Sequence, residues 1–107
     1  MSAAAEQVWA SIAATELARP HVATGTGFGK TPGLRISGKI YTMFMHGELV
    51  LKLPKGRVDE LIASGAGKRL DTGRGRLMKE WVVLGPRTML EWPALVDDAR
   101  AFVSSQF

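Results

Sequence analysis

The chain has 107 residues, a length that suits one folded domain and leaves little room for a multi-domain enzyme. Cysteine is absent, which excludes disulfides, thiolate catalysis and cysteine-based zinc sites. The 14 lysines and arginines outnumber the 10 aspartates and glutamates, so the formal net charge is +4. We therefore expect residues 1–107 to form a single basic domain.

Hydropathy gives no sign of a membrane segment or a secretory leader. No apolar run approaches the roughly 20 residues that a membrane-spanning helix needs. The stretch from Met1 to Glu6 lacks the basic start and apolar core of a signal peptide. We therefore expect a cytoplasmic protein without a membrane partner.

A first helix is predicted from the N-terminal alanine run, with Ser2 as its cap and an end at Pro20. Its apolar residues recur at helical spacing and form one face, and both acidic residues fall off that face. The apolar residues are Val8, Trp9, Ile12, Ala13 and Leu17, and the acidic residues are Glu6 and Glu16.

Residues 21–33 are rich in glycine and threonine and include Gly29-Lys30-Thr31, the ending of a phosphate-binding loop. Such a loop needs a glycine where Thr24 stands and a helix directly after the threonine. Here Pro32 follows at once and the sequence then turns to a strand pattern. We therefore expect a glycine loop, with a short edge strand around residues 23–28.

From Leu34 the apolar period changes to two, which is typical of strands. Ser37-Gly38 and His46-Gly47 are two-residue turn signals. Connections this short join antiparallel neighbours, since a parallel crossover needs a dozen or more residues. The sequence therefore predicts a meander of three strands. These strands cover residues 34–36, 40–45 and 49–53.

The second half of the chain predicts a short helix from Pro54 to Gly65, then a glycine- and arginine-rich loop over residues 66–77. A strand is predicted over residues 78–84, and a final helix begins at Pro93. The fold class is therefore α+β. We expect an antiparallel meander sheet with the N- and C-terminal helices packed on one face, as a two-layer sandwich.

Positive charge is concentrated in the middle of the chain. Residues 30–79 hold eleven basic and four acidic residues, whereas residues 1–29 and 80–107 have net charges of −1 and −2. A basic glycine-rich stretch can follow a phosphate backbone closely, although the same charge can also serve solubility alone. The candidate phosphate-binding residues are Lys39, Lys52, Lys68, Arg69, Arg74, Arg76 and Lys79.

No catalytic or metal-binding pattern accompanies this charge. His21 and His46 lie in a loop and a turn, without further ligands at metal spacing. The adjacent pairs Asp59-Glu60 and Asp97-Asp98 fall on predicted helices, where neighbouring side chains do not face each other. We therefore expect a protein that is not an enzyme and that holds no metal and no cofactor.

Three segments resemble a known family. They read GLRISGKIY from Gly33, ELVLKL from Glu48 and GRLMKEWV from Gly75. With the closing helix, these segments are similar to the YjbR/MmcQ-like family and the related N-terminal domain of TfoX-like proteins, over about residues 5–103. The resemblance implies a small bacterial cytoplasmic protein with a compact α+β sandwich, comparable to the frataxin-like (CyaY-like) fold.

The resemblance also bears on function, because members of this family are often described as DNA-binding. The basic positions that match are Lys39, Lys52, Arg76 and Lys79. Frataxin-like proteins bind iron through an acidic first helix and strand edge, whereas the first helix here has only Glu6 and Glu16. The resemblance therefore favours nucleic acid over iron.

Two functional hypotheses follow. The first is a non-enzymatic DNA- or nucleic-acid-binding module that uses the basic sheet and the Arg-Gly loop. The alternative is a protein–protein interaction domain, such as a homodimer, with no nucleic-acid ligand. The strand over residues 40–45 is apolar on both faces, which leaves room for an exposed apolar patch or strand edge.

Overall fold

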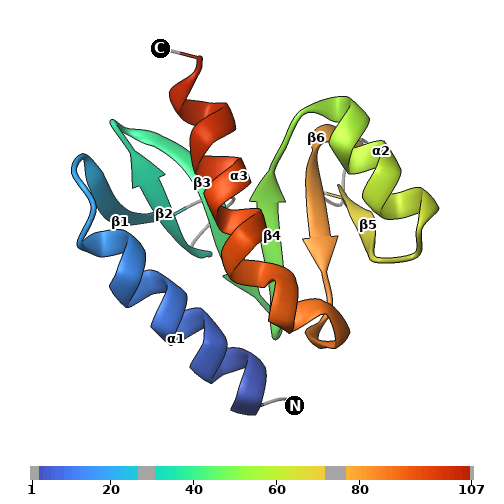
Figure 1. Cartoon of the computed structure of the whole chain (residues 1–107), viewed down its shortest axis with the longest axis horizontal. Coiled ribbons are helices and arrows are strands. Elements are labelled where there is room, and N and C mark those ends of the chain that lie inside the picture. The colour runs from blue at the N-terminus through green and yellow to red at the C-terminus, as the bar shows by residue number, and fades with distance from the viewer. Residues whose placement is uncertain (1–2, 27–30, 72–76, 107) are drawn as a thin grey trace.

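The computed structural model describes residues 3–26, 31–71 and 77–106 (Figure 1). Strands β1 to β4 follow the first helix, β5 and β6 follow the second, and a 3-10 helix, η1, precedes the last helix. In order, the elements are α1 (Ala3–Leu17), β1 (Val22–Thr26), β2 (Pro32–Ile36), β3 (Lys39–Met45), β4 (Glu48–Lys52), α2 (Lys55–Ala63), β5 (Gly67–Asp71), β6 (Leu77–Leu84), η1 (Pro86–Glu91) and α3 (Trp92–Ser104).

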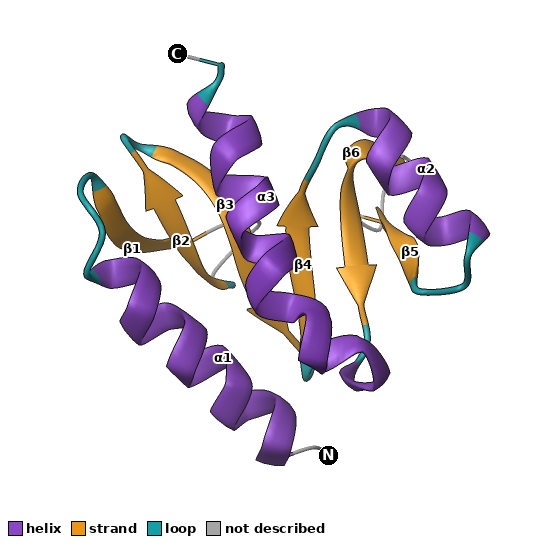
Figure 2. Cartoon of the chain, viewed as in Figure 1, coloured by secondary structure: helices purple, strands orange, loops and turns teal. Residues whose placement is uncertain are grey.

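The strands form one sheet in the order β1-β2-β3-β4-β6-β5, and every neighbouring pair is antiparallel. The helices α1, α2 and α3 lie over one face of this sheet (Figure 2). The predicted α+β fold, with helices on one face of an antiparallel sheet, is therefore confirmed. No helix in the described ranges is both long and apolar enough to cross a membrane.

Local turn chemistry explains the meander. Ser37 and Gly38 have φ values of 48° and 86°, and His46 and Gly47 have values of 53° and 76°. Two successive left-handed residues form the hairpin turn whose twist matches that of the flanking strands. Both predicted turns are therefore confirmed, and they join β2 to β3 and β3 to β4.

Alternating side chains supply two apolar clusters, one on each face of the sheet. Leu49 and Leu51 face the helices, whereas Val50 between them faces the other way. Trp92, the first residue of α3, is fully buried in the cluster between the helices and the sheet, and Trp81 is buried on the opposite face. Both tryptophans therefore serve as packing residues. The cluster opposite the helices contains Met43, Val50, Leu70, Trp81 and Val83.

The prediction of a loop over residues 66–77 is wrong for its first part, because Gly67–Asp71 forms strand β5. This strand lies at the edge of the sheet, and Leu70 is its one buried residue among those whose burial is described. A strand with so little buried surface lacks the alternation that marks β4. The predicted cap Ser2 lies outside the described residues.

The strand β2 begins at Pro32, two residues earlier than predicted. Proline cannot donate a backbone hydrogen bond but is tolerated as the first residue of a strand. The predicted edge strand is present as β1, which pairs with β2 from Val22 to Thr26.

Candidate functional site

Three of the predicted phosphate-binding residues lie at one end of the sheet. Lys39 begins β3, Lys52 ends β4 and Lys79 stands near the start of β6. Because β3, β4 and β6 are antiparallel neighbours in that order, these three strand ends meet. At about 4.8 Å between strands, the strand ends span roughly 10 Å. Lys52 pairs with Trp81 on the face opposite the helices, whereas Lys39 pairs with Ile36 on the helix face, so the group wraps around this end of the sheet. We call Lys39, Lys52 and Lys79 the lysine end.

The position of Lys52 is set by an aromatic ring. Lys52 pairs in register with Trp81, and its Nζ lies 5.9 Å from the centroid of a Trp81 ring. A cation over an indole face is attracted by the negative charge of the π system. In the described part of the chain, neither Lys52 nor the exposed Lys79 forms an ion pair. These ammonium groups are therefore not neutralised by any described carboxylate.

Arg74 and Arg76 lie outside the described residues. The residues on either side of their segment, Asp71 and Leu77, pair with each other across β5 and β6. Asp71 and Leu77 lie at the end of the sheet where β6 starts, which is also where Lys79 lies.

The other two candidates, Lys68 and Arg69, lie elsewhere. Lys68 pairs in register with Val83, toward the opposite end of β6, and its Nζ is 3.7 Å from Glu48 Oε1. Arg69 points to the helix side, where its Nη2 donates a hydrogen bond to Asp59 Oδ1. The structure therefore does not bring these two residues to the lysine end.

Arg69 and Asp59 belong to a small charged group beneath α2. Lys55 Nζ also donates to Asp59, at 2.8 Å from Oδ2. The hydrogen bonds from Lys55 and Arg69 hold the pKa of the Asp59 carboxyl below its usual value. The Nη1 of Arg69 is buried and has no hydrogen-bond partner among the described residues. This group fixes α2 on β5.

The structure contains a buried polar network that sequence reasoning missed. Glu16, expected off the apolar face of the first helix, is only 3% exposed. Its carboxylate accepts hydrogen bonds from Tyr41 Oη at 2.9 Å, Arg19 Nε at 2.9 Å and Arg100 Nη1 at 2.5 Å. Glu16 follows the buried Ile12 by four residues, which places both on one helix face and is the signal that was available.

A bulge in β3 brings Tyr41 to this network. Leu34 pairs with Thr42 and Arg35 with Ile40, so Tyr41 is the extra residue on its strand. Its side chain therefore faces the helices and is fully buried. Burial raises the pKa of the Tyr41 phenol well above its ordinary value, and the hydrogen bond to the Glu16 carboxylate raises it further.

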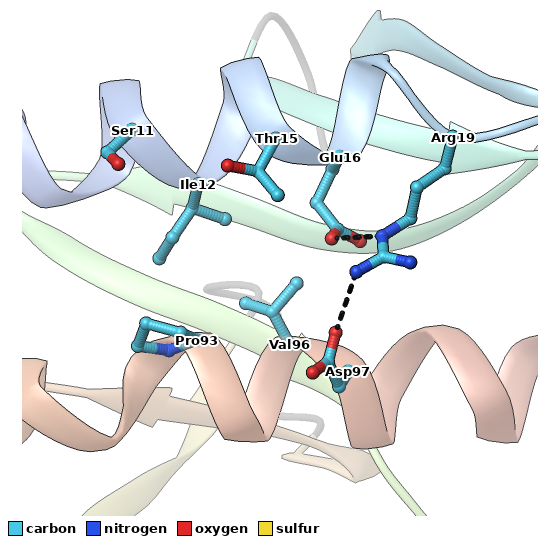
Figure 3. A pocket seen from close by; sticks show the side chains of 8 residues that line it. All are labelled: Ser11, Ile12, Thr15, Glu16, Arg19, Pro93, Val96 and Asp97. Atoms are coloured by element: carbon cyan, nitrogen blue, oxygen red, sulfur yellow. Dashed lines mark hydrogen bonds and ion pairs between the residues drawn. The ribbon is translucent and has the colours of Figure 1, made fainter.

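A hollow of about 190 Å³ lies between α1 and α3, beside this network (Figure 3). The guanidinium of Arg19 joins Glu16 to Asp97 across it, with Arg19 Nη2 at 3.6 Å from Asp97 Oδ1. Three donors occupy the Glu16 carboxylate, so its role here is to hold the two helices together. The lining residues are Ser11, Ile12, Thr15, Glu16, Arg19, Pro93, Val96 and Asp97.

The histidines and aspartates considered as catalytic or metal-binding residues do not form a site in the described part of the chain. Within the described ranges, no three histidine, aspartate or glutamate side chains gather as a metal site. His21 and His46 are exposed in turns. Asp97 and Asp98 are exposed and pair with different partners, Asp97 with Arg100 and Asp98 with Arg57.

The strand over residues 40–45 is not a strand edge of the sheet. It corresponds to β3, which lies between β2 and β4 and is therefore not an edge. Tyr41, Thr42 and Met43 on it are fully buried.

Comparisons of the chain with family models, with curated proteins and with solved structures found no match.

Proposed function

We propose that this protein is a non-enzymatic nucleic-acid-binding module, and that the lysine end contacts the phosphate backbone. The observation that carries the proposal is the meeting of Lys39, Lys52 and Lys79 at adjacent strand ends. Duplex DNA carries one negative charge per about 1.7 Å of axis, so a surface of roughly 10 Å faces about six charges. Three cations within this length would offset about half of that charge.

The proposed mode of binding is backbone contact without base readout. The basic residues at the start of α2 are engaged within the protein, Lys55 with Asp59 and Arg57 with Asp98. A recognition helix needs side chains that reach base edges in the major groove. The sheet end instead presents flexible ammonium groups, which bind phosphate as point charges. The motif resemblance to a family described as DNA-binding supports the same proposal.

The experiment is fluorescence anisotropy of a labelled duplex at several salt concentrations. The test variant is K52Q/K79Q, and the matched control is K68Q/R87Q, which removes the same charge from two exposed residues away from the lysine end. We expect the test variant to bind more weakly and to lower the salt slope by about two, at about 0.9 per phosphate contact. The control is expected to retain most of the affinity.

Two results would reject the proposal. One is an absence of binding by the unmodified protein even at low salt. The other is an equal loss in both double variants, because binding would then follow net charge rather than the position of the lysines.

A further inference from the structure

The helices α2 and α3 are separated by a groove on the outer surface of the helical layer. Two adjoining hollows of about 230 and 410 Å³ form it, and both include Arg57 and Asp98. The smaller hollow is lined by Arg57, Leu61, Glu91, Ala94, Leu95 and Asp98. The larger hollow is lined by Leu53, Pro54, Arg57, Asp98, Ala101 and Phe102.

One face of α3 forms a wall of this groove. Together with Glu91, which directly precedes α3, its lining residues run to Phe102 at intervals of one or three positions, as expected for a single helix face. At 1.5 Å per residue this wall is about 16 Å long. Ala94 and Ala101 lie on it seven positions apart and are exposed, so the backbone of another helix can approach closely there.

A large apolar side chain stands at one end of the groove. Leu90 is 95% exposed and directly precedes Glu91, which lines the smaller hollow. The larger hollow, at the other end, has Leu53, Pro54, Ala101 and Phe102 in its lining. The same surface therefore carries both a projecting leucine and an apolar hollow.

The charges of the groove are also mixed. Arg57 stands on the α2 side, whereas Glu91 and Asp98 stand on the α3 side. Arg57 Nη2 lies 3.8 Å from Asp98 Oδ2, and both side chains are about half exposed, so this contact is weak. Arg57 is therefore available to a second carboxylate.

We propose that this groove binds a second copy of the chain in a two-fold dimer. In a two-fold dimer the same patch of each copy faces the other, so the projection and the hollow of this surface, and its opposite charges, can meet one another. The rotation runs one α3 antiparallel to the other, so Leu90 of each copy enters the larger hollow of its partner. Glu91 then comes beside the partner's Arg57.

This dimer does not depend on nucleic-acid binding. Lys52 packs against Trp81 on the face of the sheet opposite the helices. The test is therefore made with the protein alone, and its failure leaves the anisotropy result unaffected.

The first experiment is sedimentation equilibrium from about 10 µM to about 1 mM, where a small interface associates. Leu90→Glu places a charge in the proposed hollow and is expected to weaken association at least tenfold. The matched control is Leu17→Glu, at the other exposed large hydrophobic residue of the described chain. It is expected to leave association unchanged.

The second experiment uses charge exchange. Arg57→Glu alone and Glu91→Arg alone each place like charges in both contacts of the dimer, so each variant should associate poorly with itself. A mixture of the two restores opposite charges at both contacts and should associate like the unmodified protein. Circular dichroism confirms that each variant is folded.

Three results would overturn the proposal. The unmodified protein could remain monomeric up to millimolar concentration, which would leave the groove to a different partner. A dimer could form that Leu90→Glu does not weaken, which would place the interface elsewhere. The charge-exchanged mixture could also fail to associate, which would reject the antiparallel arrangement.

Discussion

Glu16 on α1 accepts a hydrogen bond from Arg100 on α3, although the two residues are 84 positions apart in the chain. The same carboxylate accepts a hydrogen bond from Tyr41 on β3. One buried side chain therefore joins the first helix, the middle of the sheet and the last helix. Its burial requires all three donors, because an unpaired carboxylate in the protein interior is strongly destabilising.

Glu16→Gln is expected to lower the free energy of unfolding by about 3 kcal/mol, because it leaves Arg100 and Arg19 without their buried counter-charge. Urea denaturation followed by circular dichroism measures this loss. Glu6→Gln on the same helix is the control, since Glu6 is exposed and should change stability by less than about 0.5 kcal/mol. Equal effects of the two substitutions would show that the network contributes nothing.

The raised pKa of the buried Tyr41 phenol leads us to expect that the protein loses stability at alkaline pH. This phenol has an ordinary pKa of 10.0, which the fold raises. Above pH 10 the unfolded chain therefore loses this proton while the folded chain keeps it, so unfolding becomes more favourable as the pH rises. The slope from this group approaches about 1.4 kcal/mol per pH unit.

The measurement is urea denaturation at pH 8 to 11 of the unmodified protein and of Tyr41→Phe. The variant lacks the titrating phenol, so its stability should decline less steeply above pH 10. Parallel pH profiles would mean that the environment of Tyr41 does not shift its titration.

Gly33 and Gly56 should respond in opposite directions to alanine. A Cβ at Gly33 would lie 2.8 Å from the backbone oxygen of Thr42, whereas one at Gly56 meets no atom within 4 Å. Gly33→Ala is therefore expected to cost about 1–3 kcal/mol through overpacking. Gly56→Ala, within α2, should add up to about 1 kcal/mol through helix propensity. Thermal unfolding of both variants decides this, and a stabilising Gly33→Ala would contradict the packing described.

The pKa of Asp59 should depend on its hydrogen bonds to Lys55 and Arg69. Lys55 makes the larger contribution to its lowered pKa, and Arg69 the next. Carboxyl titration by NMR should therefore show a higher pKa for Asp59 in Lys55→Gln and a smaller increase in Arg69→Gln. An unchanged titration of Asp59 in both variants would exclude these hydrogen bonds in solution.

Local signals account for the part of the fold that could be predicted. Ser37-Gly38 and His46-Gly47 mark turns by their own conformational freedom, and the alternation of Leu49, Val50 and Leu51 marks a strand with two distinct faces. Strand β5 gave no such signal. It is defined by its hydrogen bonds to β6, and Leu70 is its one residue described as buried.

The candidate phosphate-binding site was also predicted only in part from the sequence. The sequence proposed Lys39, Lys52 and Lys79 as phosphate-binding residues together with Lys68 and Arg69, because all five are basic. A sequence does not show which basic residues lie close together in space. Only the strand order β3-β4-β6 separates the first three from the other two. That order depends on the pairing of β4 with β6, which are distant in sequence.

By itself, the sequence determined the α+β class, the meander and the basic character of residues 30–79, because these follow from periodicity, turn residues and composition. Tertiary structure alone decided that β6 inserts between β4 and β5, that three lysines share one sheet end, and that Glu16 is buried. The physical reason is that each of these features requires a partner far along the chain. For Glu16 that partner is Arg100, which no local pattern around residue 16 specifies.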